Sequence, residues 1–129
     1  MAAELHGLLD RATGLPGQFR GLLGGMVDRA VTLARDVAAD PAREAEARQA
    51  TNALYHALSA VLLAHDGIVM AKETGDARRL LLARLVVDQR LSPQDPLNPG
   101  QSAFSRRAEA LLLDEAPVPI AAALDALVA

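Results

Sequence analysis

The residue types that could do chemistry gather in one stretch of the chain, residues 52–71, with the sequence NALYHALSAVLLAHDGIVMA. At 100° per residue, a helix over this stretch places Asn52, His56, Ser59 and Asp66 on one face. Histidine beside a carboxylate is a common arrangement for general acid–base catalysis. Ten residues separate His56 from Asp66, however, which puts them about 15 Å apart along the helix axis. The pattern therefore brings no base to a nucleophile, and we assign no catalytic residue to this chain.

Two interpretations of this polar face stay open. Its side chains line a pocket, or they form a packing contact that neighbouring helices or a second subunit satisfies. Arg84, on the next predicted helix, is a fifth candidate for the same site. It can pair with a carboxylate, Asp66 among them, or bind an anion such as a phosphate group of coenzyme A. We favour the packing contact for the face and a carboxylate partner or solvent for Arg84, because such surface pairs are common.

The three histidines, His6, His56 and His65, do not form a metal-binding pattern. His56 and His65 are nine positions apart, so they point to opposite sides of a helix and cannot share an ion. The sequence has no Glu-x-x-His motif of the kind that di-iron bundles use. It also has no cysteine, which excludes disulfides, thiol catalysis and zinc–thiolate sites. We therefore predict no metal site.

A glycine-rich segment, TGLPGQFRGLLGG at residues 13–25, invites comparison with phosphate-binding loops. It contains neither Gly-Lys-Ser/Thr nor the G-x-G-x-x-G spacing, and no predicted strand precedes it. We interpret residues 1–17 as a mobile N-terminal segment that leads into a helix.

The composition favours a bundle of helices. Hydrophobic residues make up 51% of the chain but aromatic residues only 2%, so leucine, valine and alanine must build the core. A proline-rich crossover at residues 92–101 separates the last two predicted helices from the others. We predict one domain, residues 1–129, that is an all-α, antiparallel up-and-down bundle of four main helices with short terminal helical segments. The predicted helices are Glu4–Ala12, Gln18–Ala39, Pro41–Glu73, Ala77–Leu91, Ala103–Leu113 and Ile120–Val128.

The helix over residues 52–71 is predicted to be central, because it is apolar nearly all the way round. Its small residues repeat at alternating spacings of four and three, which forms a seam where another backbone can approach closely. These residues are Ala53, Ala57, Ala60, Ala64, Gly67 and Ala71. Gly75 suits the left-handed position after this helix, and Asp76 suits the N-cap of the next. The short connection predicts an antiparallel hairpin.

Charge and hydropathy exclude some partners. The formal net charge is −3, and the three aromatic residues are scattered, so we predict no nucleic-acid binding. The N-terminus does not resemble a signal peptide, and a cytoplasmic location is the default expectation. His65 and Asp66 interrupt the longest apolar stretch, so we predict no membrane span.

Two segments together resemble a known family. YHALSAVLLAHDG and GDARRLLLARLVVDQRL are similar to the helical C-terminal region of bacterial acyl-CoA dehydrogenase-like flavoproteins, over about residues 31–97. The resemblance implies an isolated domain, or a stand-alone relative of it, associated with FAD-dependent acyl-CoA oxidation. Nothing in the sequence corresponds to the family's β-domain or its catalytic glutamate segment. The resemblance therefore implies FAD in a parent or partner flavoprotein and no cofactor in this chain.

The leading hypothesis is a non-catalytic interaction or oligomerisation domain that packs against a flavoprotein core or a second copy of itself. The alternative is a small helical-bundle module that binds a hydrophobic ligand such as an acyl chain or acyl-CoA. In that alternative, Asn52, His56, Ser59 and Arg84 supply the polar contacts.

Overall fold

The computed structural model of the chain describes residues 1–92, 95–97 and 102–128. Most of the predicted crossover at residues 92–101 lies outside the described residues. The described residues form helices and no strand, which confirms the predicted all-α fold. The six α-helices are α1 (Ala2–Arg11), α2 (Gly17–Ala39), α3 (Ala47–Thr74), α4 (Arg78–Val86), α5 (Ala103–Leu113) and α6 (Ile120–Leu127). A 3-10 helix (Pro41–Glu46) precedes α3, and a π-helical turn (Val87–Leu91) continues α4.

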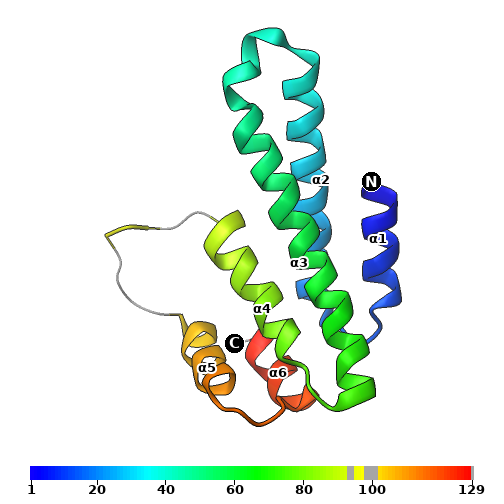
Figure 1. The fold of residues 1–129 in the computed structure, drawn as a ribbon, viewed down its shortest axis with the longest axis vertical. Helices are drawn as coiled ribbons and strands as arrows, with labels where there is room; N and C mark the ends of the chain where they lie inside the picture. The colour runs from blue at the N-terminus through cyan, green and yellow to red at the C-terminus, as the bar shows by residue number, and fades with distance from the viewer. Residues whose placement is uncertain (93–94, 98–101, 129) are drawn as a thin grey trace.

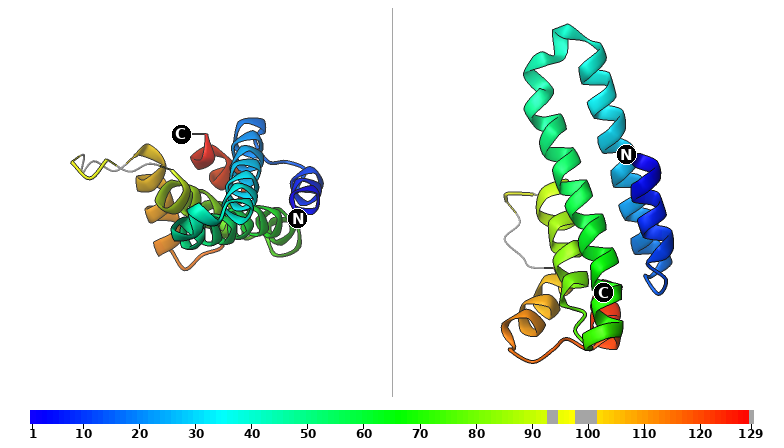
Figure 2. Two further views of the ribbon diagram at one scale, coloured as in Figure 1. Left: turned by 90° about the horizontal axis from the view of Figure 1, so that it is seen from above. Right: turned by 45° about the vertical axis from the view of Figure 1, so that its right-hand side comes forward.

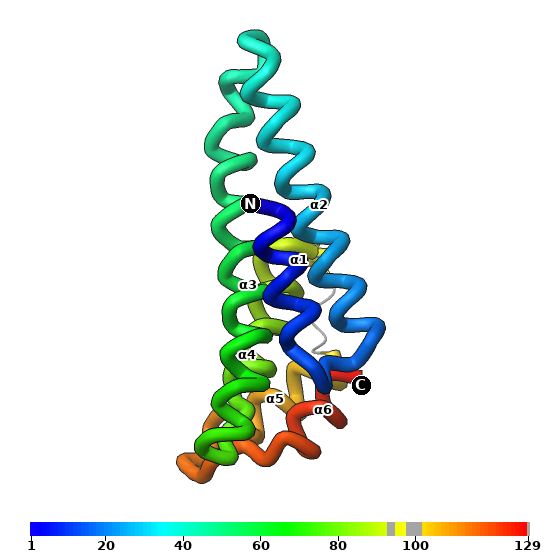
Figure 3. The backbone as a smooth tube through the Cα atoms, turned by 90° about the vertical axis from the view of Figure 1, so that its right-hand side faces the viewer, coloured from blue at the N-terminus to red at the C-terminus, as the bar shows by residue number. Residues whose placement is uncertain are grey.

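The antiparallel hairpin of α2 and α3 is the longest part of the fold and extends past the other helices as a two-helix arm (Figure 1). Helix α1 packs along α2 and α3 on one side (Figure 3), and α4 packs along α3 on another (Figure 2). Helices α5 and α6 lie at the end of the bundle away from the tip of the arm, where both contact α4. Consequently α3 is the one described helix that contacts α1, α2 and α4 together.

The helix ends follow the capping residues. Asp40 Oδ1 accepts a hydrogen bond from the Ala42 amide at 3.0 Å, and Pro41 is the first helical residue. This first turn is 3-10, so the long helix predicted from Pro41 begins as α-helix only at Ala47. Ser102 Oγ accepts from the Ser105 amide at 3.0 Å, which confirms the predicted cap of α5.

The turn between α3 and α4 is tied to the C-terminal part of the chain. Gly75 has a left-handed φ of 74°, and its amide donates to the Ala71 carbonyl at 3.2 Å, as predicted for a helix end. Ala77, rather than the predicted Asp76, occupies the N-cap of α4. Asp76 Oδ1 instead accepts from the amides of Arg78 and Val118, each at 3.1 Å. The Ala77 amide returns a hydrogen bond to the Val118 carbonyl at 2.8 Å.

These contacts also change the acidity of Asp76. The hydrogen bond from the Val118 amide, reinforced by the Arg78 amide and guanidinium, lowers the pKa of the Asp76 carboxyl below its ordinary value. The carboxylate is therefore favoured in the folded state, where it fastens the segment before α6 to the α3–α4 turn.

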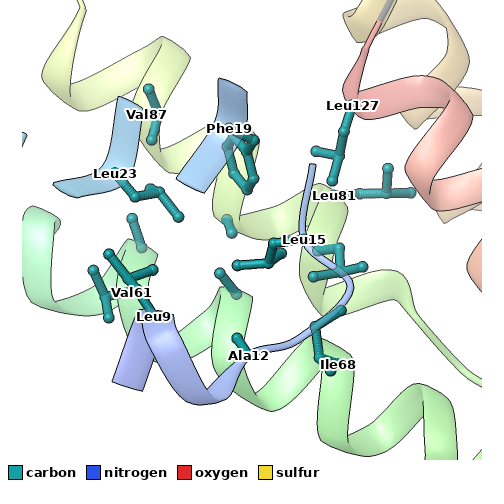
Figure 4. Packing of buried hydrophobic residues seen from close by; sticks show 14 of the residues in the cluster. Leu9, Ala12, Leu15, Phe19, Leu23, Val61, Ile68, Leu81, Val87 and Leu127 are labelled. Carbon is teal, nitrogen blue, oxygen red and sulfur yellow. The ribbon is translucent and has the colours of Figure 1, made fainter. Parts of the chain in front are cut away.

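The core lies where the lower half of the α2–α3 hairpin meets α1, α4 and α6 (Figure 4). Leu23 of α2, Val61 of α3 and Leu81 of α4 are each at most 1% exposed. Helices α3 and α4 approach each other closely at Gly67. A Cβ atom there would lie 2.8 Å from both the backbone nitrogen and Cγ of Leu80, so this crossing requires glycine.

The N-terminal segment, residues 1–17, is packed onto this core. Leu5 and Leu9 of α1, together with Ala12 and Leu15 after it, are buried. Four buried side chains attach the segment to α2 and α3. Its predicted mobility stays a prediction.

One described helical stretch, Pro41–Thr74, is long and apolar enough to cross a membrane by length and composition alone. Its most apolar window has a mean hydropathy of 1.4, and 33% of that window is buried. A core helix of a globular protein passes the same test, so the predicted absence of a membrane span and the cytoplasmic location stay predictions. The low buried fraction shows that this apolar helix keeps a large uncovered side.

Candidate interaction face on helix α3

Helix α3 carries two seams on opposite sides. The inner seam consists of the small residues Ala57, Ala60, Ala64 and Gly67, all buried in the bundle. It coincides with the small-residue seam predicted from the spacing of four and three. Because these side chains add little bulk, the backbones of α2 and α4 can approach α3 closely.

The outer seam lies about 160° around the helix from the inner seam, at 100° per residue. Its residues alternate at spacings of four and three over the whole of α3, the period of a coiled-coil contact. They are Arg48, Asn52, Tyr55, Ser59, Leu62, Asp66, Val69 and Glu73. Every one of them is exposed or half-buried. Tyr55 is 64% exposed, Leu62 40% and Val69 36%.

The outer seam forms one wall of a shallow groove between α3 and α4, here named the α3–α4 groove. Its volume is about 650 Å³. Tyr55, Ser59, Leu62 and Asp66 line the α3 side, and the α4 side is mainly apolar. That second wall consists of Leu82, Leu85 and Val86 of α4, with Gln89 and Arg90 of the π-helical turn at its end. Two antiparallel helices with an apolar channel between them form a surface on which a further helix can pack.

The structure places three of the five predicted site residues on this face. Ser59 Oγ donates to the Tyr55 carbonyl of its own helix at 2.8 Å. Asp66 lies 3.7 Å from Arg79 Nη1 and 3.4 Å from His65 Nδ1, with its side chain still 50% exposed. Asn52 is exposed and has no hydrogen-bond partner among the described residues. The residues therefore share a face, as predicted, but do not converge on a catalytic geometry.

His56 lies at the edge of the same face. Its ring meets the ring of Tyr55 edge-on, with centroids 5.2 Å apart. The side chain lines the α3–α4 groove and also a second, adjoining groove between α2 and α3. No carboxylate is within hydrogen-bonding distance of His56 among the described residues, so it has no orienting partner for general-base catalysis.

Arg84 does not belong to this face, and the possible pairing with Asp66 is wrong. Its Nε donates to Asp88 Oδ1 at 3.0 Å, and its Nη1 donates to the Leu127 carbonyl at 2.9 Å. The guanidinium carbon also lies 4.8 Å from the centroid of the Phe104 ring. Arg84 thus joins α4 to α5 and α6, and its predicted pairing with a carboxylate is confirmed with Asp88 as the partner.

The second groove, here named the α2–α3 groove, runs along the two-helix arm and ends at the π-helical turn after α4. Its volume is about 970 Å³. Met26, Leu33, Ala53 and Leu91 contribute apolar surface. Its polar lining residues are Asp28, Arg29, Thr32, Asp36, Arg48, Gln49, Asn52, His56 and Arg90. Asn52 and His56 are the two predicted pocket residues that it contains, whereas Ser59 lies in the α3–α4 groove and Arg84 in neither.

The three arginines of the α2–α3 groove, Arg29, Arg48 and Arg90, make no ion pair with the described residues. Of the two carboxylates there, Asp28 is engaged by His6 Nε2 at 2.7 Å on the α1 side. The groove therefore combines apolar surface with three arginines that make no ion pair within the described part of the chain. Within the described residues, no cluster of three His, Asp or Glu side chains is arranged to hold a metal ion.

The site residues predicted from the sequence do not include the apolar members of the outer seam, Tyr55, Leu62 and Val69, or its two ends, Arg48 and Glu73. The sequence contained a signal for the two ends, because Arg48 and Glu73 continue the spacing of four and three that Tyr55, Leu62 and Val69 follow.

A scan against protein-family models, a search of curated proteins and a search of solved structures each found no match. The resemblance to acyl-CoA dehydrogenase-like flavoproteins therefore stays a prediction.

Proposed function

We propose that this chain is a non-catalytic helical interaction module that docks a partner helix on the outer seam of α3. One observation carries the proposal: a coiled-coil-spaced row with Tyr55, Leu62 and Val69 at its centre is exposed along α3. Leu82 of α4, which is 36% exposed, continues this apolar surface across the α3–α4 groove. Aromatic and aliphatic side chains grouped in this way are typical of a contact surface rather than a solvated one.

The nature of the partner follows from the geometry of the groove and from the family resemblance. A groove between two antiparallel helices accepts a third helix, as in a bundle. The resemblance favours a partner that is an acyl-CoA dehydrogenase-like flavoprotein core or a second copy of this chain. FAD would then reside in the flavoprotein, and the chain would contribute contact surface to the assembly. This association with a flavoprotein is a proposal that the outer seam makes chemically reasonable.

The test is the molar mass of the chain, by light scattering coupled to size exclusion, alone and mixed with an acyl-CoA dehydrogenase-like core from the same organism. We expect a mass above the monomer value of 13.6 kDa in at least one of the two conditions. Leu62→Asp should abolish the association, because it places a charge in the apolar centre of the seam. The matched control is Leu22→Asp, since Leu22 of α2 is 38% exposed and lies outside the seam. A monomer in both conditions would refute the proposal.

A second candidate function is supported by the α2–α3 groove. Its apolar surface and its arginines, which form no ion pair with residues that the structure describes, suit an amphipathic anion such as a fatty acid or an acyl-CoA. Thermal unfolding with and without these ligands tests the idea, and Arg29→Ala and Arg90→Ala should reduce any stabilisation. Arg35→Ala is the matched control, because Arg35 is exposed on α2 and does not line the groove. This function would be excluded if the ligand raised the unfolding temperature equally in all three variants, or if it did not raise that of the unmodified chain.

A further inference from the structure

We infer that the occupant of the outer seam is a second copy of this chain, with the two α3 helices packed antiparallel. This inference rests on the proposed function and names its partner. The outer seam is self-complementary in that orientation, because its two ends carry opposite charges, Arg48 at one and Glu73 at the other. A twofold contact requires such a surface, since the same residues face each other on both copies.

The pairing follows from the spacing alone. When the twofold axis passes midway between Ser59 and Leu62, each of these residues faces the other on the second copy. One step further out, Tyr55 faces Asp66 of the second copy, and at the ends Arg48 faces Glu73. Between these pairs, Asn52 faces Val69 of the second copy. Each of the four pairs occurs twice in the dimer, so the contact contains two Arg–Glu and two tyrosine–carboxylate pairs, together with two Asn–Val and two Ser–Leu pairs.

The pair formed by Tyr55 and Asp66 of the second copy is chemically matched. A tyrosine hydroxyl donates a hydrogen bond to a carboxylate, and such charge-assisted bonds are among the stronger ones. The Asp66 carboxylate can take part because its side chain is 50% exposed despite its contact with Arg79. Tyr55, 64% exposed, is the most exposed large apolar side chain of the seam.

The opposite orientation is disfavoured by charge. In a parallel pair each seam residue would face its own copy, so Arg48 would meet Arg48, Asp66 would meet Asp66 and Glu73 would meet Glu73. Like charges placed together in a contact discriminate strongly against it. The seam from Arg48 to Glu73 spans about 38 Å along the helix axis, so its two charged ends are well separated and act independently.

The experiment is sedimentation equilibrium of the full chain and four charge variants over a range of concentrations. We expect the unmodified chain to approach twice 13.6 kDa. Arg48→Glu and Glu73→Arg should each raise the dimer dissociation constant about tenfold or more, because each creates two like-charge contacts. The double variant carrying both changes should restore dimerisation. Arg35→Glu, at an exposed position of α2 outside the seam, is the matched control and should dimerise normally.

Mixing the two single variants gives the sharpest result. In a mixed dimer one end joins the two reversed charges and the other end joins the two original charges, so both ends are attractive again. We expect the mixture to dimerise more tightly than either variant alone. If a charge reversal also lowers helicity by circular dichroism, Leu62→Gln replaces it, and unchanged dimerisation in that variant overturns the inference.

The outcomes separate this inference from the proposed function. A chain that is monomeric at every concentration but binds the flavoprotein core refutes the second copy and leaves the interaction module intact. A chain that binds neither refutes both. A monomer that floats with phosphatidylcholine vesicles assigns the seam to a lipid surface and also refutes both. The antiparallel pairing is overturned if the charge reversals leave the dimer dissociation constant unchanged. It is also overturned if the double variant does not restore dimerisation.

Discussion

The inner and outer seams of α3 have the same alternating spacing of four and three residues, yet one is buried in the bundle and the other is exposed. The inner seam is built from alanine and glycine and is covered by α2 and α4. The outer seam alternates large apolar and polar side chains and is uncovered in the chain described here. Small residues allow close packing within one molecule, whereas mixed large and charged residues suit a contact that must also be specific. The comparison assigns folding to one side of the helix and association to the other.

The largest effect on folding should come from the partner of the inner seam. Leu80 of α4 is fully buried over Gly67, and Leu80→Ala removes its side chain from this close contact between α3 and α4. We expect a loss of about 2–5 kcal/mol in the free energy of unfolding, the range for buried leucines. Urea denaturation followed by circular dichroism measures it. A loss below about 1 kcal/mol would show that the inner seam does not hold the bundle together.

Adding a methyl group to the same contact should lower the free energy of unfolding by less than removing the Leu80 side chain does. In Gly67→Ala the new Cβ would meet Leu80 at 2.8 Å, and one of the contacted atoms is backbone nitrogen, so α4 must shift. We expect destabilisation of about 1–3 kcal/mol, even though alanine favours the helix. Gly25→Ala is the matched control, because that helical glycine has open space at its Cβ position and should gain stability.

How much of this could be predicted from the sequence depends on whether the signal was local. Asp40 with Pro41, Gly75 and Ser102 mark helix ends through contacts within a few residues, so the boundaries were predictable. The inner seam was predictable too, because only small residues permit backbones to meet. The carboxylate partner of Arg84 is also local, because Asp88 is four residues away. The contact of Arg84 with the Leu127 carbonyl was not predictable, since that carbonyl is 43 residues away and its position depends on the packing of α6.

The candidate site was predictable in part for the same reason. The helical period places Asn52, Ser59 and Asp66 on one face wherever the helix packs. A helix that is apolar nearly all the way round does not reveal which of its stripes the rest of the chain covers. Only the packing of α1, α2 and α4 shows that the stripe through Tyr55, Leu62 and Val69 stays exposed.

The α3–α4 turn, which connects the two helices packed at the inner seam, should make a pH-dependent contribution to the free energy of unfolding. The folded state lowers the pKa of Asp76, so its stabilisation is fully present above the unfolded pKa of about 4. It is lost as the pH falls through the folded pKa. Asp76→Asn weakens the hydrogen bonds to the Val118 and Arg78 amides, and we expect it to cost about 1–2 kcal/mol at pH 7. The exposed Asp10→Asn is the control.

The measurement is urea denaturation of both variants between pH 7 and pH 2.5. The difference between the unmodified chain and Asp76→Asn should shrink as the pH drops below about 4 and protonates the carboxylate. A difference that stays constant over this range would mean that the side-chain amide disturbs packing and that the charge of Asp76 contributes nothing.

The smallest effect on folding should come from the outer seam, and it tests the comparison most directly. Leu62→Ala makes the same chemical change as Leu80→Ala, but Leu62 is 40% exposed. We expect it to cost about 1 kcal/mol or less in monomer stability, since little packing is lost. Because association stabilises the folded state by mass action, unfolding must be measured below the concentration at which the chain dimerises. There the variant should resemble the unmodified chain, while at higher concentration its dimer should be weaker. If Leu62→Ala destabilised the monomer as much as Leu80→Ala, both sides of α3 would serve folding, and the division between the two seams would be wrong.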